Sequence, residues 1–79
     1  MVNIEVKSRE DMVLQIFGQI FNKDVSELSK DTRLEEDLHA KSLNIIGLVA
    51  MIEAELGTGP TFSSAMRMKR IGEFINFLE

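Results

Sequence analysis

The sequence predicts an all-α protein: a small antiparallel bundle of three to four helices, with a long loop between the first and second helices. Two segments space their apolar residues three and four positions apart, as one face of a helix requires, and a third segment is apolar over most of its length. One proline interrupts the 79 residues, whose abundant Leu, Ile, Met, Glu and Lys favour helices. A chain this short has one core, so residues 1–79 are predicted to form a single domain.

The first helix is predicted from Arg9 to Phe21. Ser8 precedes it as a capping residue, and two acidic residues occupy the first turn, where the helix dipole favours carboxylates. One apolar face follows at helical spacing, formed by Val13, Ile16, Phe17 and Ile20. Residues 1–7 alternate apolar and polar side chains like a strand, but a lone strand has nothing to pair with. We therefore expect a flexible tail or an early helical turn there.

Residues 22–40 are polar and rich in turn-forming residues. Isolated apolar side chains occur in this stretch at Val25, Leu28, Leu34 and Leu38. A loop of this length is unusual in a compact domain and is often functional. We expect its leucines to pin it across the bundle.

The second helix is predicted from Ser42 to near Gly57. It carries two apolar stripes, one formed by Ile45, Val49, Ile52 and Leu56 and the other by Leu43, Ile46 and Ala50. A helix that is apolar on so many sides is either central in the bundle or presents an apolar patch to a partner, and the two roles are compatible.

The remaining chain predicts a turn at 57–60, a short helical turn at 61–66 and a closing helix. The closing helix has the clearest stripe, formed by Ile71, Phe74, Ile75 and Leu78. Lys69 and Arg70 stand at its start, which is the unfavourable end for cations. Because no structural reason for them is visible in the sequence, they are candidates for partner contact.

Composition excludes several functions. The chain has no cysteine, and the lone His39 cannot build a zinc site by itself, so no metal is predicted. The net charge of −4 argues against nucleic acid, whose phosphates require a basic surface. There is no apolar run of membrane-spanning length and no signal-peptide pattern. We expect a cytoplasmic monomer without membrane insertion.

Ser42 is the candidate modification site. A serine at the start of a helix after a long loop is accessible to an enzyme, and the unpaired N–H groups there favour an attached phosphodiester by about 0.3–1 kcal/mol per charge. The simpler interpretation is that Ser42 only caps the helix. Local physical chemistry by itself favours the simpler interpretation.

The order of the predicted parts resembles the acyl carrier proteins, whose signature is Asp-Leu-Gly-Ala-Asp-Ser-Leu. Residues 37–43 read Asp-Leu-His-Ala-Lys-Ser-Leu, so five positions match while His39 replaces the glycine and Lys41 the second aspartate. The stretches 31–38 and 49–56 are also similar to the family. The resemblance covers roughly residues 10–79.

The resemblance implies a carrier rather than an enzyme. Ser42 would receive 4′-phosphopantetheine from coenzyme A through a phosphopantetheinyl transferase. The thiol of that arm would carry acyl intermediates as thioesters to fatty-acid, polyketide or related biosynthetic enzymes. The absence of cysteine is no obstacle, because the reactive sulfur belongs to the cofactor.

Two departures from the family suggest a specialised carrier. Lys41 reverses the charge that usually helps a basic transferase to recognise the serine, and its ammonium is a candidate contact for the attached phosphate. Gly47 and Ala54 occupy positions that are commonly acidic, which leaves the second helix less acidic than usual. Docking of enzymes is predicted on this helix, from Ser42 to about Glu53, and on the loop before it. The predicted partner contacts are Asp37, Leu43, Ile46, Gly47, Ala50 and Glu53.

Three other functions are compatible with parts of this sequence. The main alternative is an unmodified helical interaction module that docks through its apolar second helix. A peptidyl or aminoacyl carrier ranks lower, because the Gly-Gly-His/Asp-Ser pattern is missing. Hydrolysis by His39 and Ser42 is not expected, because so small a chain has little scaffold for a base, an orienting acid and an oxyanion pocket. A separate expectation concerns flexible and aromatic side chains of the later helices, which either line a cleft for an acyl chain or simply fill the core: Met51, Phe62, Met66, Met68 and Phe74.

Overall fold

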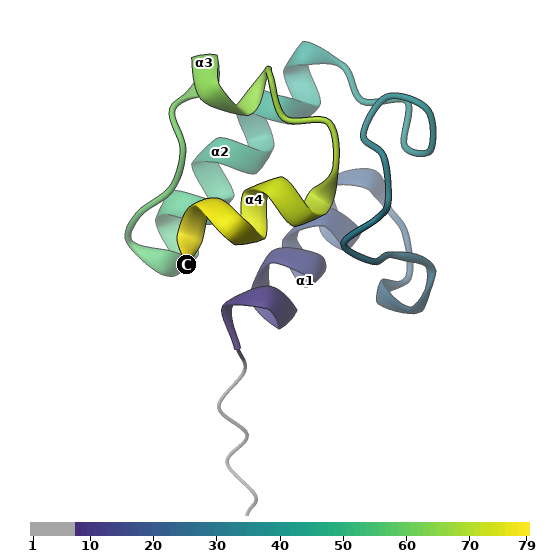
Figure 1. The fold of residues 1–79 in the computed structure, drawn as a ribbon, viewed down its shortest axis with the longest axis horizontal. Helices are drawn as coiled ribbons and strands as arrows, with labels where there is room; N and C mark the ends of the chain where they lie inside the picture. The colour runs from purple at the N-terminus through teal and green to yellow at the C-terminus, as the bar shows by residue number, and fades with distance from the viewer. Residues whose placement is uncertain (1–7) are drawn as a thin grey trace, which may run out of the picture.

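The computed structural model describes residues 8–79, and in this part of the chain it is entirely helical apart from loops (Figure 1). The predicted tail at residues 1–7 lies outside the described residues. The elements are α1 (Arg9–Phe21), a 3-10 turn η1 (Val25–Glu27), α2 (Ser42–Leu56), α3 (Phe62–Ala65) and α4 (Ile71–Leu78). The predicted fold class, a small helical bundle with a long loop after its first helix, is confirmed.

Helix α1 begins and ends as the sequence predicts. The Ser8 hydroxyl accepts a hydrogen bond from the backbone N–H of Asp11 at 3.1 Å, which satisfies one of the free donors of the first turn. At the other end Asn22 adopts the left-handed conformation, with φ of 55°, and its N–H donates to the carbonyl of Gly18. Both ends of α1 are therefore fixed by local contacts.

The core lies where α1, α2 and α4 meet. Phe17 of α1 and Phe74 of α4 are fully buried and touch edge to face, with ring centroids 5.1 Å apart. The predicted stripe of α4 is buried along its whole length. From α2 the buried side chains are Ile45, Leu48 and Ile52. Each such side chain contributes about 1.5–3 kcal/mol by leaving water, so this junction carries most of the fold's hydrophobic stabilisation.

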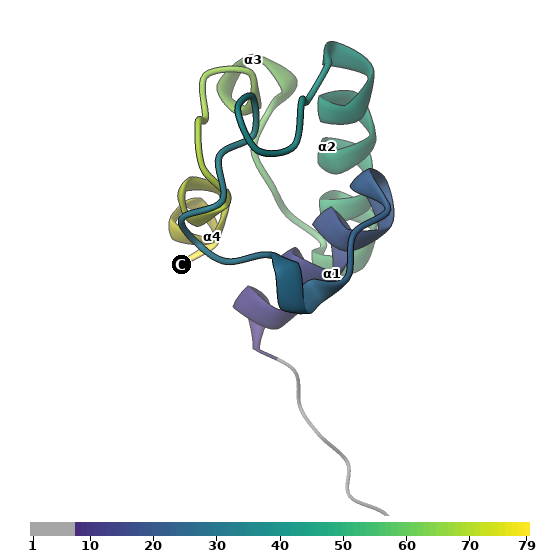
Figure 2. The same ribbon diagram turned by 90° about the vertical axis from the view of Figure 1, so that its right-hand side faces the viewer.

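The loop between α1 and α2 is tied down at many points. Its three leucines, Leu28, Leu34 and Leu38, are all buried, as predicted, whereas Val25 is 40% exposed. Figure 2 shows the loop leaving α1, passing the start of α4 and rising to the start of α2. A polar segment is thus built into the bundle by three apolar side chains.

Backbone hydrogen bonds fasten this loop to the start of α4. The N–H of Leu34 donates to the carbonyl of Lys69 at 2.9 Å, and the N–H of Ile71 donates to the carbonyl of Thr32 at 3.0 Å. The guanidinium of Arg70 donates to the carbonyl of Asp31 at 3.0 Å. Arg70, for which the sequence offered no structural reason, therefore holds the loop against α4.

Candidate functional site

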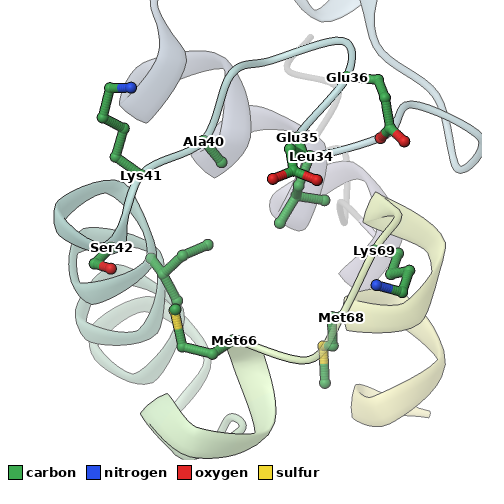
Figure 3. A pocket seen from close by; sticks show the side chains of 10 residues that line it. Leu34, Glu35, Glu36, Ala40, Lys41, Ser42, Met66, Met68 and Lys69 are labelled. Carbon is green, nitrogen blue, oxygen red and sulfur yellow. The ribbon is translucent and has the colours of Figure 1, made fainter.

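An open cleft of about 540 Å³ lies between the long loop, the first turn of α2 and the segment that joins α3 to α4 (Figure 3). Half of its lining residues are apolar, and the others include charged side chains of both signs. The lining residues are Leu34, Glu35, Glu36, Ala40, Lys41, Ser42, Ile45, Met66, Met68 and Lys69. The predicted modification site is thus on the wall of the cleft.

Ser42 is exposed, and it is the first residue of α2 rather than its cap. The cap position belongs to Lys41, whose side chain makes no capping hydrogen bond. Within residues 8–79 the Ser42 hydroxyl takes part in no side-chain hydrogen bond, in contrast to Ser8 and Thr61, which cap α1 and α3. The interpretation that Ser42 merely caps the helix is therefore wrong, because its hydroxyl is left open to solvent.

The first turn of α2 provides free donors next to that hydroxyl. The side chain of Asn44 turns back and accepts from the backbone N–H of Lys41 at 2.8 Å, which orients the chain as it enters the helix. A lysine side chain has no acceptor, so it cannot satisfy the N–H groups at the start of the helix. These donors and the positive end of the helix dipole suit an anion attached to Ser42.

Lys41 directs its ammonium away from the cleft and away from the Ser42 hydroxyl (Figure 3). Within residues 8–79 its ammonium forms no ion pair, since the two pairs found there join Lys30 to Glu10 and Arg33 to Asp37. The phosphate contact predicted for Lys41 therefore stays a prediction. In the described residues the structure shows its ammonium without an ion pair, close in the chain to the serine.

Asp37 is engaged with its own loop. Its carboxylate accepts hydrogen bonds from the backbone N–H of Arg33 at 2.8 Å and from the guanidinium at 3.2 Å. The hydrogen bond from the Arg33 backbone is the largest cause that lowers the pKa of Asp37 below its ordinary value, and the hydrogen bond from the Arg33 side chain comes next. The charge of Arg70 lowers this pKa as well. This predicted partner contact therefore also closes a turn of the loop.

His39 occupies an unfavourable backbone conformation three residues before the serine. Its φ is 54°, in the left-handed region that glycine adopts without cost, and its N–H donates to the carbonyl of Glu35 at 3.0 Å. The acyl carrier signature has glycine at this position, and the histidine of this chain takes the glycine conformation.

One face of α2 remains uncovered, and we call Leu43, Ile46 and Ala50 the exposed α2 face. Leu43 is 78% exposed and Ile46 is 51% exposed, and Ala50 is also exposed. Gly47 is half-buried at the edge of this face, where an added Cβ would lie 3.0 Å from the Cδ1 atom of Ile20 in α1. Among the predicted contacts, the structure thus brings three together on one face and places Gly47 at the contact between helices.

The other predicted residues divide between the cleft, the core and the surface. Met66 and Met68 line the cleft, whereas Phe74 is in the core, Met51 packs against the core and Phe62 is 42% exposed. Sequence reasoning missed the charged rim, where Glu35 and Glu36 lie on the loop and Lys69 on the opposite side. Only the unexplained position of Lys69 before α4 gave any signal of this.

In the described part of the chain, no three His, Asp or Glu side chains are grouped as a metal site would need. None of the helices there is long and apolar enough to cross a membrane.

Comparison with known proteins identifies the family. Residues 11–78 match the model of the phosphopantetheine attachment site. The chain is 27% identical over 75 residues to an acyl carrier protein of Rickettsia bellii (strain RML369-C), covering 95% of this chain and 87% of that protein. It is 31% identical over 70 residues to the acyl carrier protein of Rickettsia canadensis (strain McKiel), covering 89% and 81%. The chain therefore belongs to the acyl carrier proteins, the non-catalytic carriers of a covalent 4′-phosphopantetheine.

Proposed function

We propose that Ser42 is the residue that receives 4′-phosphopantetheine from coenzyme A through a phosphopantetheinyl transferase. The Ser42 oxygen forms a bond to the phosphorus next to pantetheine, the bond between the two phosphates of coenzyme A breaks, and the nucleotide leaves. The serine proton passes to a base of the transferase. The observation that carries this proposal is an exposed hydroxyl that makes no side-chain hydrogen bond within residues 8–79, at the start of α2 and on the wall of an open cleft.

The residues around Ser42 fit the attached group. Free N–H groups in the first turn of α2 favour a phosphodiester. The apolar side chains of Ile45, Met66 and Met68, which line part of the cleft, offer contact area to a flexible arm, since thioethers adapt to varied shapes. When bound, the cofactor supplies a thiol that holds acyl groups as thioesters, and the protein positions and presents it.

The carrier serves biosynthetic enzymes of the fatty-acid, polyketide or related type. These enzymes dock on α2 from Ser42 to about Glu53, chiefly through the exposed α2 face, with Asp37 and Gly47 at its border. The absence of charged side chains between Ser42 and Ile52 supports a specialised carrier with dedicated enzymes. The proposal also places the protein in the cytoplasm as a monomer that does not bind nucleic acid, a point favoured by its net charge of −4.

Intact-mass spectrometry tests the attachment. The apo protein is incubated with coenzyme A and each of several transferases, and we expect a gain of one phosphopantetheine. The gain disappears in Ser42→Ala and persists in Ser63→Ala, a matched control because Ser63 is also an exposed serine in the first turn of a helix, α3.

Two results would contradict the proposal. A gain that persists in Ser42→Ala would move the attachment elsewhere. No gain with any transferase would favour the alternative, an unmodified interaction module that binds partners through α2.

A further inference from the structure

The surface beside Ser42 is apolar and nearly uncharged. The exposed α2 face begins one residue after the serine and continues along the helix, because positions 43, 46 and 50 share one side of it. Met66, which is 47% exposed, adds to the apolar surface from across the cleft. In a soluble protein, apolar side chains this exposed and this close together indicate contact with another molecule.

Lys41 is the cation that borders this surface. Its ammonium points into solvent and is unpaired within residues 8–79 (Figure 3). The nearest acidic residue along α2 is Glu53. It follows Ser42 by eleven residues, which corresponds to about 16 Å along the helix axis. Charges on a protein surface are screened over about 8 Å at physiological ionic strength. Glu53 therefore does not offset Lys41 near the serine.

The acidic residues of the cleft rim are placed differently. Glu35 and Glu36 lie on the loop, on the far side of the cleft from Ser42 (Figure 3). Lys69 also lies on the rim, so the cleft itself carries both signs of charge. Among the charged side chains that line the cleft, Lys41 is the one that adjoins Ser42 and the exposed α2 face in the chain.

A transferase acting on Ser42 must cover both neighbours of that serine. Its reacting groups have to come within bonding distance of the hydroxyl, and Lys41 and Leu43 flank it in the chain. Other enzymes also dock on α2, but they act on the end of the attached arm and need not bring their reacting groups to the serine itself. The transferase is therefore the partner whose surface must match this one.

We propose that the transferase for this chain covers the exposed α2 face with an apolar surface and sets a carboxylate against Lys41. This inference rests on the proposed function and names the partner's chemistry. Apolar contact provides the affinity, because Leu43 and Ile46 are the large side chains available for burial. The ion pair between Lys41 and the transferase carboxylate orients the two proteins as they meet, and its contribution to binding weakens as the salt concentration rises.

The test uses the transferase, among those tried on the unaltered chain, that gives the highest kcat/KM. We expect Leu43→Ala and Ile46→Ala each to lower kcat/KM about tenfold or more. Lys41→Asp is also expected to lower kcat/KM. Raising NaCl from 50 to 500 mM should reduce the difference in kcat/KM between Lys41→Asp and the unaltered chain, because salt screens the charge. The effect of Leu43→Ala persists in high salt.

Matched controls separate local contact from general effects. Phe77→Ala removes an apolar side chain of 51% exposure from α4, and Lys23→Asp makes the same charge change at the far end of the loop. Both are expected to leave kcat/KM within about twofold of the unaltered value. Thermal unfolding by circular dichroism verifies that every variant is folded.

Three outcomes would overturn the inference. Lys41→Asp could raise kcat/KM, which would mean a basic transferase surface. Leu43→Ala and Ile46→Ala could leave kcat/KM as little changed as Phe77→Ala does, which would mean that the transferase does not cover the exposed α2 face. Light scattering could show a dimer that Leu43→Ala dissociates, which would assign the face to a second copy. Each of these leaves the modification of Ser42 intact, whereas failure of the proposed function would give either no modification or a modification that persists in Ser42→Ala.

Discussion

The long loop and helix α2 differ from what their compositions would lead one to expect about burial. The loop is polar, yet it is fastened by three buried leucines and by backbone hydrogen bonds to the start of α4. Helix α2 is apolar, yet Leu43 and Ile46 face solvent. The difference shows that stability and binding are divided between two adjoining regions, with Ser42 at the junction.

The division has a physical basis. A leucine in the loop replaces water with core contacts and so stabilises the fold. A leucine on the exposed α2 face gains nothing until a partner arrives, and its apolar area then contributes to binding. The same residue type thus has opposite consequences on the two sides of Ser42.

The largest expected difference between the loop and the exposed α2 face comes from the same Leu→Ala substitution made once in each region. Leu34→Ala, at a side chain 4% exposed, is expected to lower the free energy of unfolding by about 2–5 kcal/mol, because it leaves a cavity. Leu43→Ala, at a side chain 78% exposed, is expected to change it by less than about 0.5 kcal/mol. Urea unfolding followed by circular dichroism measures both. Equal costs for the two variants would show that the exposed α2 face is packed against the fold in solution.

A smaller change is expected at His39. His39→Gly removes the cost of holding a side chain at φ of 54°, and we expect the free energy of unfolding to rise by about 0.5–1 kcal/mol. The same urea titration measures the gain. Ala40→Gly is the control, and it should lower stability because Ala40 lies outside the left-handed region. A loss of stability in His39→Gly would mean that contacts of the imidazole outweigh the backbone strain.

The smallest effect is the pH dependence of the loop turn at Asp37. Because its folded pKa is lowered, this carboxylate stabilises the fold fully above its unfolded pKa, near 3.8. The contribution disappears as pH falls through the lower folded pKa. Asp37→Asn should therefore be less stable than the unaltered chain at pH 6, and the gap should close toward pH 2.

Unfolding curves at several pH values check this. Arg33→Gln removes the guanidinium from the same turn, so it should show a gap that closes over the same window. A gap that stays constant between pH 6 and pH 2 would show that the charge of Asp37 does not stabilise the loop.

Much of the bundle could be predicted because its signals are local. The start of α1 at Arg9 follows from the Ser8 cap, and the burial of α4 follows from the spacing of Ile71, Phe74, Ile75 and Leu78. Such features depend on residues within a turn or two of each other. The position of Ser42 at the start of α2 was predictable for the same reason.

The cleft and the role of Arg70 were not predictable, because they join residues far apart in the chain. Glu35 and Lys69 line the same cleft although 34 positions separate them, and the guanidinium of Arg70 donates to the carbonyl of Asp31 across 39 positions. Sequence periodicity carries no information about such pairs. The capping interpretation of Ser42 failed for a related reason, since which residue occupies the cap depends on how the tethered loop delivers the chain to α2.

The sequence by itself determined the helices, the apolar stripes and the serine at the head of α2, since all of these follow from spacing along one segment. Only the tertiary structure decided which stripe of α2 is buried, because the side that the rest of the fold covers depends on how helices far apart in the chain pack together. It also decided that the Ser42 hydroxyl is exposed and that Lys41 forms no ion pair within residues 8–79, since both depend on what the folded loop leaves uncovered.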